Sequence, residues 1–98
     1  MPMFELTCPA SALDPAVRSQ LVADLTTVLL RAEGAPDTEF FRGITWGYVR
    51  ELPADAVLAG GRPVAAPTFR LVVTTPEGAL SEGRRAELMA EATRVITE

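Results

Sequence analysis

The chain contains Thr7-Cys-Pro-Ala-Ser-Ala-Leu-Asp-Pro-Ala-Val-Arg-Ser-Gln-Leu21 and, 67 residues later, Thr74-Thr-Pro-Glu-Gly-Ala-Leu-Ser-Glu-Gly-Arg-Arg-Ala-Glu-Leu88. Continued over residues 7–29, this alignment needs no gap and has nine identities. The identical pairs are Thr7/Thr74, Pro9/Pro76, Ala12/Ala79, Leu13/Leu80, Arg18/Arg85, Leu21/Leu88, Ala23/Ala90, Thr26/Thr93 and Val28/Val95. Similarity at a fixed offset indicates that one structural unit occurs twice in the chain.

The first copy of the unit has the pattern of a strand, a helix and a second strand. Residues 3–8 alternate apolar and polar side chains, as a half-buried strand does. Asp14-Pro15 is a typical helix start, because Asp caps the free N–H groups and Pro is tolerated in the first turn. Apolar residues then recur at helical spacing as far as Gly34, and residues 40–51 predict the second strand.

The second copy repeats the first strand and the helix. Residues 68–75 predict a strand, and Ser81, the counterpart of Asp14, predicts the cap of a helix that ends the chain. Between the copies, residues 53–67 are rich in Pro and Gly and predict a loop with a short edge strand at Val57–Leu58.

The repeat predicts an α+β fold in a single domain of residues 1–98. Its units are residues 2–51 and 69–98, and the second unit lacks a closing strand. We expect a predominantly parallel four-stranded sheet with both helices on one face, because a strand–helix–strand unit forms a right-handed crossover.

Composition excludes several classes of site. The chain has no histidine, and Cys8 is its one cysteine, which excludes His-based triads, His metal ligands and an intrachain disulfide. A net charge of −4 argues against nucleic acid as a partner. No apolar run reaches the length of a membrane span, so we expect a cytoplasmic protein. All basic residues are arginine, which suits a GC-rich bacterial genome and excludes Schiff-base lysine chemistry.

Pro2 is the strongest catalytic candidate. Removal of Met1 is expected before a small residue, and it would leave a secondary amine at the N-terminus. A free α-amine titrates near neutrality, and an apolar pocket lowers its pKa further, so that it can act as a base at pH 7. The alternative is that Pro2 only starts a strand.

The Met1-Pro2 start, the strand that follows it directly and the duplicated strand–helix–strand unit resemble the tautomerase superfamily. The superfamily includes 4-oxalocrotonate tautomerase, malonate semialdehyde decarboxylase and macrophage migration inhibitory factor. Residues 34–44, Gly-Ala-Pro-Asp-Thr-Glu-Phe-Phe-Arg-Gly-Ile, are similar to the family's turn between helix and second strand. The resemblance implies a homotrimer in which Pro2 is the general base, or the general acid when protonated. It also implies small 2-oxo acid, enol or acrylate substrates, with no cofactor and no metal.

Arginine is suited to clamping a substrate carboxylate. The resemblance places Arg42 close to a substrate-binding arginine of the family. Arg70 is the repeat counterpart of Met3, which is the neighbour of Pro2. We therefore expect Arg70 beside the site. Arg62 lies in a Gly-Gly-Arg-Pro loop and could act as a mobile clamp. Each of these arginines could instead be a solvated surface charge.

Three further residues complete the candidate site. Glu39 falls where the resemblance places an acidic residue that assists the proline, and its alternative is a surface charge. Trp46 and Tyr48 are two residues apart and therefore share one strand face. They could form a wall of the substrate pocket, with the Tyr48 hydroxyl polarising a carbonyl, or pack in the core or at a subunit interface.

The function expected from these residues is an isomerase reaction, the keto–enol tautomerisation of a small 2-oxo acid with Pro2 as base. The first alternative is a hydratase or decarboxylase of small three-carbon acids, with protonated Pro2 as acid and Glu39 holding water. A retained Met1 would make the Pro2 nitrogen a nonbasic amide and would favour a second alternative, a catalytically silent trimeric binding protein.

Overall fold

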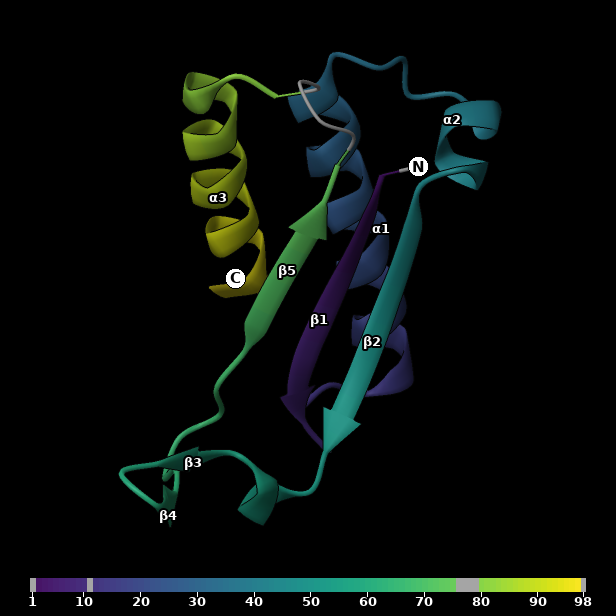
Figure 1. The fold of residues 1–98 in the computed structure, drawn as a ribbon. Coiled ribbons are helices and arrows are strands. Elements are labelled where there is room, and N and C mark those ends of the chain that lie inside the picture. Colours follow the sequence, from purple (N-terminus) through teal and green to yellow (C-terminus); the bar gives the residue numbers. More distant parts are fainter. Residues whose placement is uncertain (1, 11, 76–79, 98) are drawn as a thin grey trace.

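The structure is a computed structural model that describes residues 2–10, 12–75 and 80–97. Its main sheet has the order β2–β1–β5, from β1 (Met3–Pro9), β2 (Trp46–Leu52) and β5 (Arg70–Thr74). Helices α1 (Pro15–Glu33) and α3 (Glu82–Thr97) cover one face of this sheet and leave the other open (Figure 1). The short elements are α2 (Glu39–Gly43), the 3₁₀ turn η1 (Ala54–Ala56) and the hairpin of β3 (Leu58–Ala59) and β4 (Arg62–Pro63).

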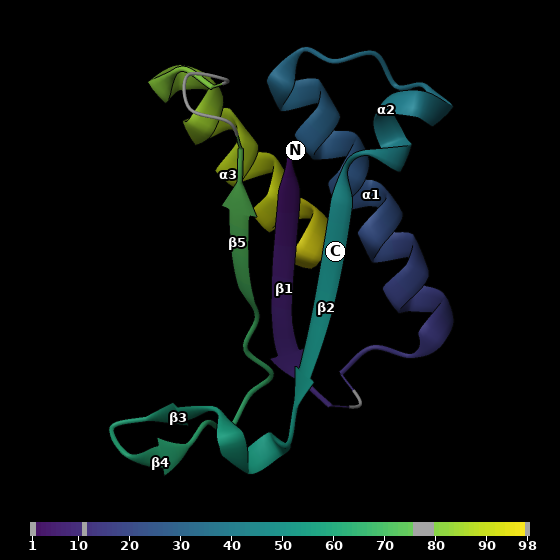
Figure 2. The ribbon, with the colours of Figure 1, turned by 45° about the vertical axis from the view of Figure 1, so that its right-hand side comes forward.

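The predicted fold class and the single helical layer are confirmed, but the predicted sheet is wrong in two respects. The sheet has three strands, and the hairpin forms a separate two-stranded sheet. β1 runs parallel to β2 and antiparallel to β5. The orientation follows from the path of the chain. β2 ends beside the hairpin, and β5 starts from that same end of the sheet, so β5 runs back without the crossover that a parallel strand needs (Figure 2).

The core lies between the sheet and the two helices. On β1, the alternating residues Phe4, Leu6 and Cys8 are buried, whereas the intervening side chains are only partly covered. The leucines of α1, including Leu25 and Leu29, pack against Phe4 and Leu6. Phe4, Leu6 and Cys8 therefore define the helix-facing side of the sheet, and every second residue along each strand faces this side.

The 67-residue offset recurs in the structure. β1 and β5 start at Met3 and Arg70, and α1 and α3 start at Pro15 and Glu82. Both helices have the same cap, in which the side chain of Asp14 or Ser81 accepts from the backbone N–H three residues later. The pairing of β1 with β5 places Glu5 opposite Val72, and these residues are also 67 apart. An approximate twofold axis therefore passes between them. The matched Pro76 and Ala79 lie outside the described residues.

The predicted second strand begins too early. Residues 40–43 belong to α2, and β2 starts only at Trp46. The Thr38 side chain accepts a hydrogen bond from the Phe41 N–H at 3.4 Å, and the Thr45 hydroxyl donates to the Phe41 carbonyl at 2.8 Å. These caps stabilise a helical turn in a segment whose aromatic residues by themselves favour a strand.

The predicted edge strand at Val57–Leu58 is shifted by one residue to Leu58–Ala59. Its hairpin turns at Gly60 and Gly61, whose φ angles of 60° and 78° are typical of a two-residue type I′ turn.

Candidate functional site

Pro2 lies at one end of the sheet, beside the start of β2 and the end of β5. Its carbonyl accepts a hydrogen bond from the Trp46 N–H at 3.2 Å, and the next residue, Met3, is opposite both Trp46 and Thr74. Pro2 is partly buried. The end of the central strand is thus enclosed by its two neighbours, and a reacting group here would have protein on both sides.

The alternation of β1 places Pro2 on the helix-facing side, two residues before Phe4. Figures 1 and 2 both show the N-terminal end of β1 at the same end of the fold as the C-terminal end of α1. In Figure 1, α2 lies near the same end of the sheet. The candidate site is therefore bounded by the end of the sheet, the end of α1 and the α2 segment.

Trp46 and Tyr48 lie on the open face of the sheet. Their side chains are 52% and 45% exposed, and their rings meet edge to face at a centroid distance of 6.4 Å. Trp46 is beside Met3, whereas Tyr48 is opposite Glu5 in the middle of the sheet. Of this pair, only Trp46 is close to Pro2 along the strand, and it projects to the opposite face. Within one chain, the two rings do not form a wall over the Pro2 ring.

The Arg42 guanidinium is anchored to α1. It donates to the Ala23 carbonyl and to the Thr27 hydroxyl, both at 3.1 Å, and to the Asp37 carboxylate at 2.9 Å. Its side chain is 33% exposed. Arg42 therefore fixes α2 against α1, and a substrate carboxylate would compete with Asp37 for its charge.

Arg70 does not lie beside Pro2 within the chain, contrary to the prediction. It is opposite Thr7, four residues along β1 from Met3, because β5 is antiparallel and the approximate twofold axis exchanges the two ends of the sheet. Arg62 is in the hairpin at this far end as well (Figure 2). Both side chains are exposed. Either arginine could reach substrate at Pro2 only if a second copy of the chain brought it there.

Glu39 is exposed in the first turn of α2. Within the described part of the chain it forms no ion pair, so its carboxylate is available to hold water or a cation. On the open face, Glu5 in the middle of the sheet pairs with Arg50 of β2 at 4.0 Å.

Two residues at the Pro2 end were not predicted. Arg85 of α3 lines a cavity of about 460 Å³ together with Thr74 and Thr75 at the end of β5. Its repeat counterpart, Arg18, forms an ion pair with Glu51. Glu33, the last residue of α1, is partly buried, and burial raises its pKa, while the positive charge of the N-terminus acts to lower it. The spacing of four residues from Leu29 was the available signal for Glu33.

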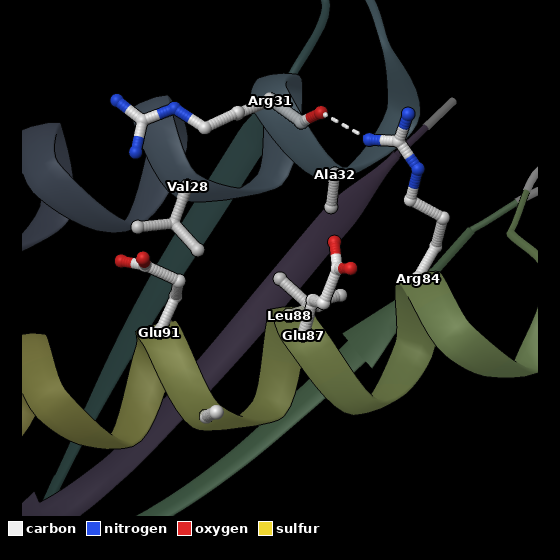
Figure 3. Close-up of a pocket in the computed structure, with 8 residues that line it drawn as sticks. Val28, Arg31, Ala32, Arg84, Glu87, Leu88 and Glu91 are labelled. Carbon is white, nitrogen blue, oxygen red and sulfur yellow. Dashed lines mark hydrogen bonds between the residues drawn. The ribbon is translucent and has the colours of Figure 1, made fainter.

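A further cavity of about 290 Å³ lies between α1 and α3 (Figure 3). Val28, Ala32 and Leu88 form its apolar part, and the Arg84 guanidinium donates to the Arg31 carbonyl across it at 3.3 Å. None of the predicted site residues lines this cavity.

The described residues contain no group of three or more Asp, Glu or Cys side chains that could hold a metal ion. No helix in the described part of the chain is both long and apolar enough to cross a membrane.

No protein-family model and no curated protein matches the chain. Solved structures do share its fold. One of Pt0534 inactivated by 2-oxo-3-pentynoate has a TM-score of 0.81 at 22% identity, over 97% of this chain and 71% of that one. A fused 4-OT symmetric trimer has a TM-score of 0.79 at 17% identity, and the match covers 97% of this chain and 71% of that one. N1, a member of the cis-3-chloroacrylic acid dehalogenase family, has a TM-score of 0.71 at 19% identity. This match covers 97% of this chain and 63% of that one. The chain therefore has the tautomerase superfamily fold, as the sequence indicated.

Proposed function

We propose that the protein is a cofactor-independent tautomerase that interconverts the keto and enol forms of a small 2-oxo acid, with the Pro2 amine as general base. The observation that carries this proposal is the position of Pro2. It is partly buried at the end of the central strand, between β2 and β5, on the fold that fused 4-OT also has.

The reaction needs one proton to be moved along the substrate. The neutral amine removes a proton from the carbon next to the carbonyl, and an enolate and a secondary ammonium result. The ammonium then returns the proton one or two atoms away, and the amine is regenerated. The chemistry requires that Met1 be removed, because an amide nitrogen is not basic at pH 7.

A cation must hold the substrate carboxylate. Arg42 and Arg85 are the two candidates at the Pro2 end, and Arg85 is exposed beside Thr74 and Thr75. Arg62 and Arg70 would join the site from a neighbouring subunit. Replacing the correct arginine with Gln should raise KM more than it lowers kcat, because the carboxylate is bound in both the ground state and the transition state.

We also propose that the chain forms a homotrimer. The exposed rings of Trp46 and Tyr48 lie on the sheet face that the helices leave open, and large exposed aromatic side chains mark interaction surfaces. The structures of fused 4-OT proteins described as trimers support the same assembly. We expect the protein to act in the cytoplasm, where the free thiol of Cys8 stays reduced.

The second candidate is a hydratase or decarboxylase of small three-carbon acids, in which protonated Pro2 is the acid. The exposed Glu39 favours it, because its unpaired carboxylate could hold the attacking water.

The test begins with the intact mass of the purified protein, which shows how much of it lacks Met1. Ketonisation of the enol of a 2-oxo acid, followed by its ultraviolet absorbance, is then compared between wild type and Pro2→Ala. The proposal predicts loss of at least about 100-fold in kcat/KM, the usual contribution of a positioned general base. Equal rates refute it. Glu39→Gln separates the candidates, since it should spare tautomerisation and abolish hydration. A mass that includes Met1 on all molecules would favour a binding protein.

A further inference from the structure

Glu33 occupies a position on α1 that an apolar residue would normally hold. Leu25 and Leu29 precede it at intervals of four residues and are 3% and 1% exposed. Residues four apart on a helix lie on the same side, so Glu33 continues this core-facing row by one turn. Its side chain is partly buried, in keeping with that position.

Pro2 continues the corresponding row on the sheet. Phe4 packs against Leu25 and Leu29, and Pro2 is the next residue toward the N-terminus on the same side of β1. α1 runs antiparallel to β1, so the C-terminal end of the helix and the N-terminal end of the strand are at the same end of the fold (Figures 1 and 2). Four helical residues rise about 6 Å and two strand residues rise about 6.6 Å, which brings Glu33 level with Pro2.

The charged side chains around Glu33 leave its carboxylate available to pair with the Pro2 amine. Within the described part of the chain, no arginine forms an ion pair with Glu33. Arg42 is held by α1 backbone and Asp37, and Arg84 donates to the Arg31 carbonyl. The ends of β2 and β5 contribute no charge here. The other charged residues near this end are Arg31 on α1, Asp37, Glu39 and Arg42 around α2, and Glu82, Arg84 and Arg85 on α3.

The pKa of Glu33 is raised by burial, and the positive charge of the N-terminus opposes this shift. The dipole of α1 also favours a cation at the C-terminal end of this helix.

We propose that Glu33 is a positioning residue for the Pro2 amine, whose protonated form donates a hydrogen bond to the Glu33 carboxylate. The inference rests on the proposed function in one respect, that Pro2 becomes the N-terminal residue. Glu33 holds the nitrogen at the end of the sheet and stabilises the ammonium that forms when the amine takes a proton. It thereby makes the amine a stronger base and sets the pH at which it changes between base and acid.

The experiment is an NMR titration of protein labelled with ¹⁵N-proline, from which Met1 has been removed as shown by intact mass. The titration midpoint of the Pro2 nitrogen is compared between wild type, Glu33→Gln and the control Asp55→Asn, which removes an exposed carboxylate of η1. We expect Glu33→Gln to lower the midpoint by about one pKa unit, the lower end of the effect of an opposite charge at short range. We expect Asp55→Asn to leave the midpoint close to the wild-type value. Equal midpoints in wild type and Glu33→Gln overturn the proposal.

Two further measurements keep the result interpretable. Glu33→Asp retains the charge on a shorter side chain, so its Pro2 titration midpoint should lie between those of the wild type and Glu33→Gln. If Glu33→Gln does not fold, a Glu33→Asp midpoint equal to that of the wild type overturns the proposal. The titration needs no substrate. A wild type that is inactive but shows the expected midpoints would refute the proposed function alone, and an active wild type with equal midpoints would refute the role of Glu33 alone.

Discussion

Among the glycines in the described part of the chain, Gly47 is the one at which an added Cβ would be most crowded. It is opposite Phe4 in the pairing of β1 with β2, and the Phe4 ring lies over it. A Cβ on residue 47 would be 2.8 Å from Phe4 Cε2 and 2.9 Å from Cε1, and closer still to Cζ. The ring is 1% exposed, so it has no solvent to move into.

The size of the effect of Gly47→Ala follows from these distances. Carbon atoms prefer to be about 3.5–4.0 Å apart, so the ring or strand must move by roughly 0.7 Å or more. Overpacking of this kind costs about 1–3 kcal/mol. Replacing Gly with Ala restores about 0.4–1 kcal/mol by restricting the unfolded chain. We therefore expect the free energy of unfolding to fall by about 1–2 kcal/mol, measured by urea denaturation at one fixed protomer concentration.

Gly83→Ala is the matched control, because nothing lies within 4 Å of the added Cβ and residue 83 is in the first turn of α3. It should leave stability unchanged or raise it. In a Phe4→Leu background the shorter side chain should relieve the clash, so that the two substitutions couple by about 0.5–3 kcal/mol. A Gly47→Ala protein as stable as wild type, with no coupling to Phe4→Leu, would show that the ring does not cover Gly47.

Three other predictions concern pH, assembly and helix caps. Burial and the nearby Glu51 raise the pKa of Cys8 from its usual value near 9. The thiol therefore loses its proton at lower pH in the unfolded chain than in the folded one, and the free energy of unfolding should fall as the pH rises above about 9. Denaturation measured at several pH values should show this slope in the wild type and not in Cys8→Ala. Trp46→Glu places a charge on the open sheet face and should shift the protein toward monomers, which light scattering measures. The trimer proposal fails if the particle mass is the same as that of the wild type. Asp14→Ala and Ser81→Ala should each cost about 1 kcal/mol of stability because each removes a cap; two neutral substitutions would contradict the equivalence of the two helix starts.

Local signals in the sequence were sufficient to locate most of the fold. The alternation of residues 3–8, the Asp14 and Ser81 caps and the offset of 67 residues place the starts of both helices correctly to the residue. α2 was missed because a five-residue helix is too short to show periodicity, and its aromatic residues favour a strand. The direction of β5 was also wrong, since pairing between distant strands depends on where the intervening chain leads and not on local preference.

The candidate site was harder to derive than the fold. Pro2 was identifiable because its role depends on its position in the sequence. Arg70 was misplaced because the offset alone does not say how the two units are related in space, and the antiparallel pairing sends it to the far end. Glu33 was overlooked because a charged residue before a C-capping glycine usually faces solvent. Its interest appears only when the last turn of α1 is seen beside the N-terminal end of β1.

The approximate twofold axis between Glu5 and Val72 gives the sheet two ends of similar backbone shape. The repeat counterpart of Pro2 is Phe69, which lies beside a cavity of about 440 Å³ at the far end. The same scaffold thus presents a pyrrolidine ring at one end and a phenyl ring at the other. A protein engineer can use this pair as an internal comparison, since a substitution that shapes one end can be transferred to the other by shifting its number by 67. Differences in ligand preference between the ends would then report the contribution of the amine itself.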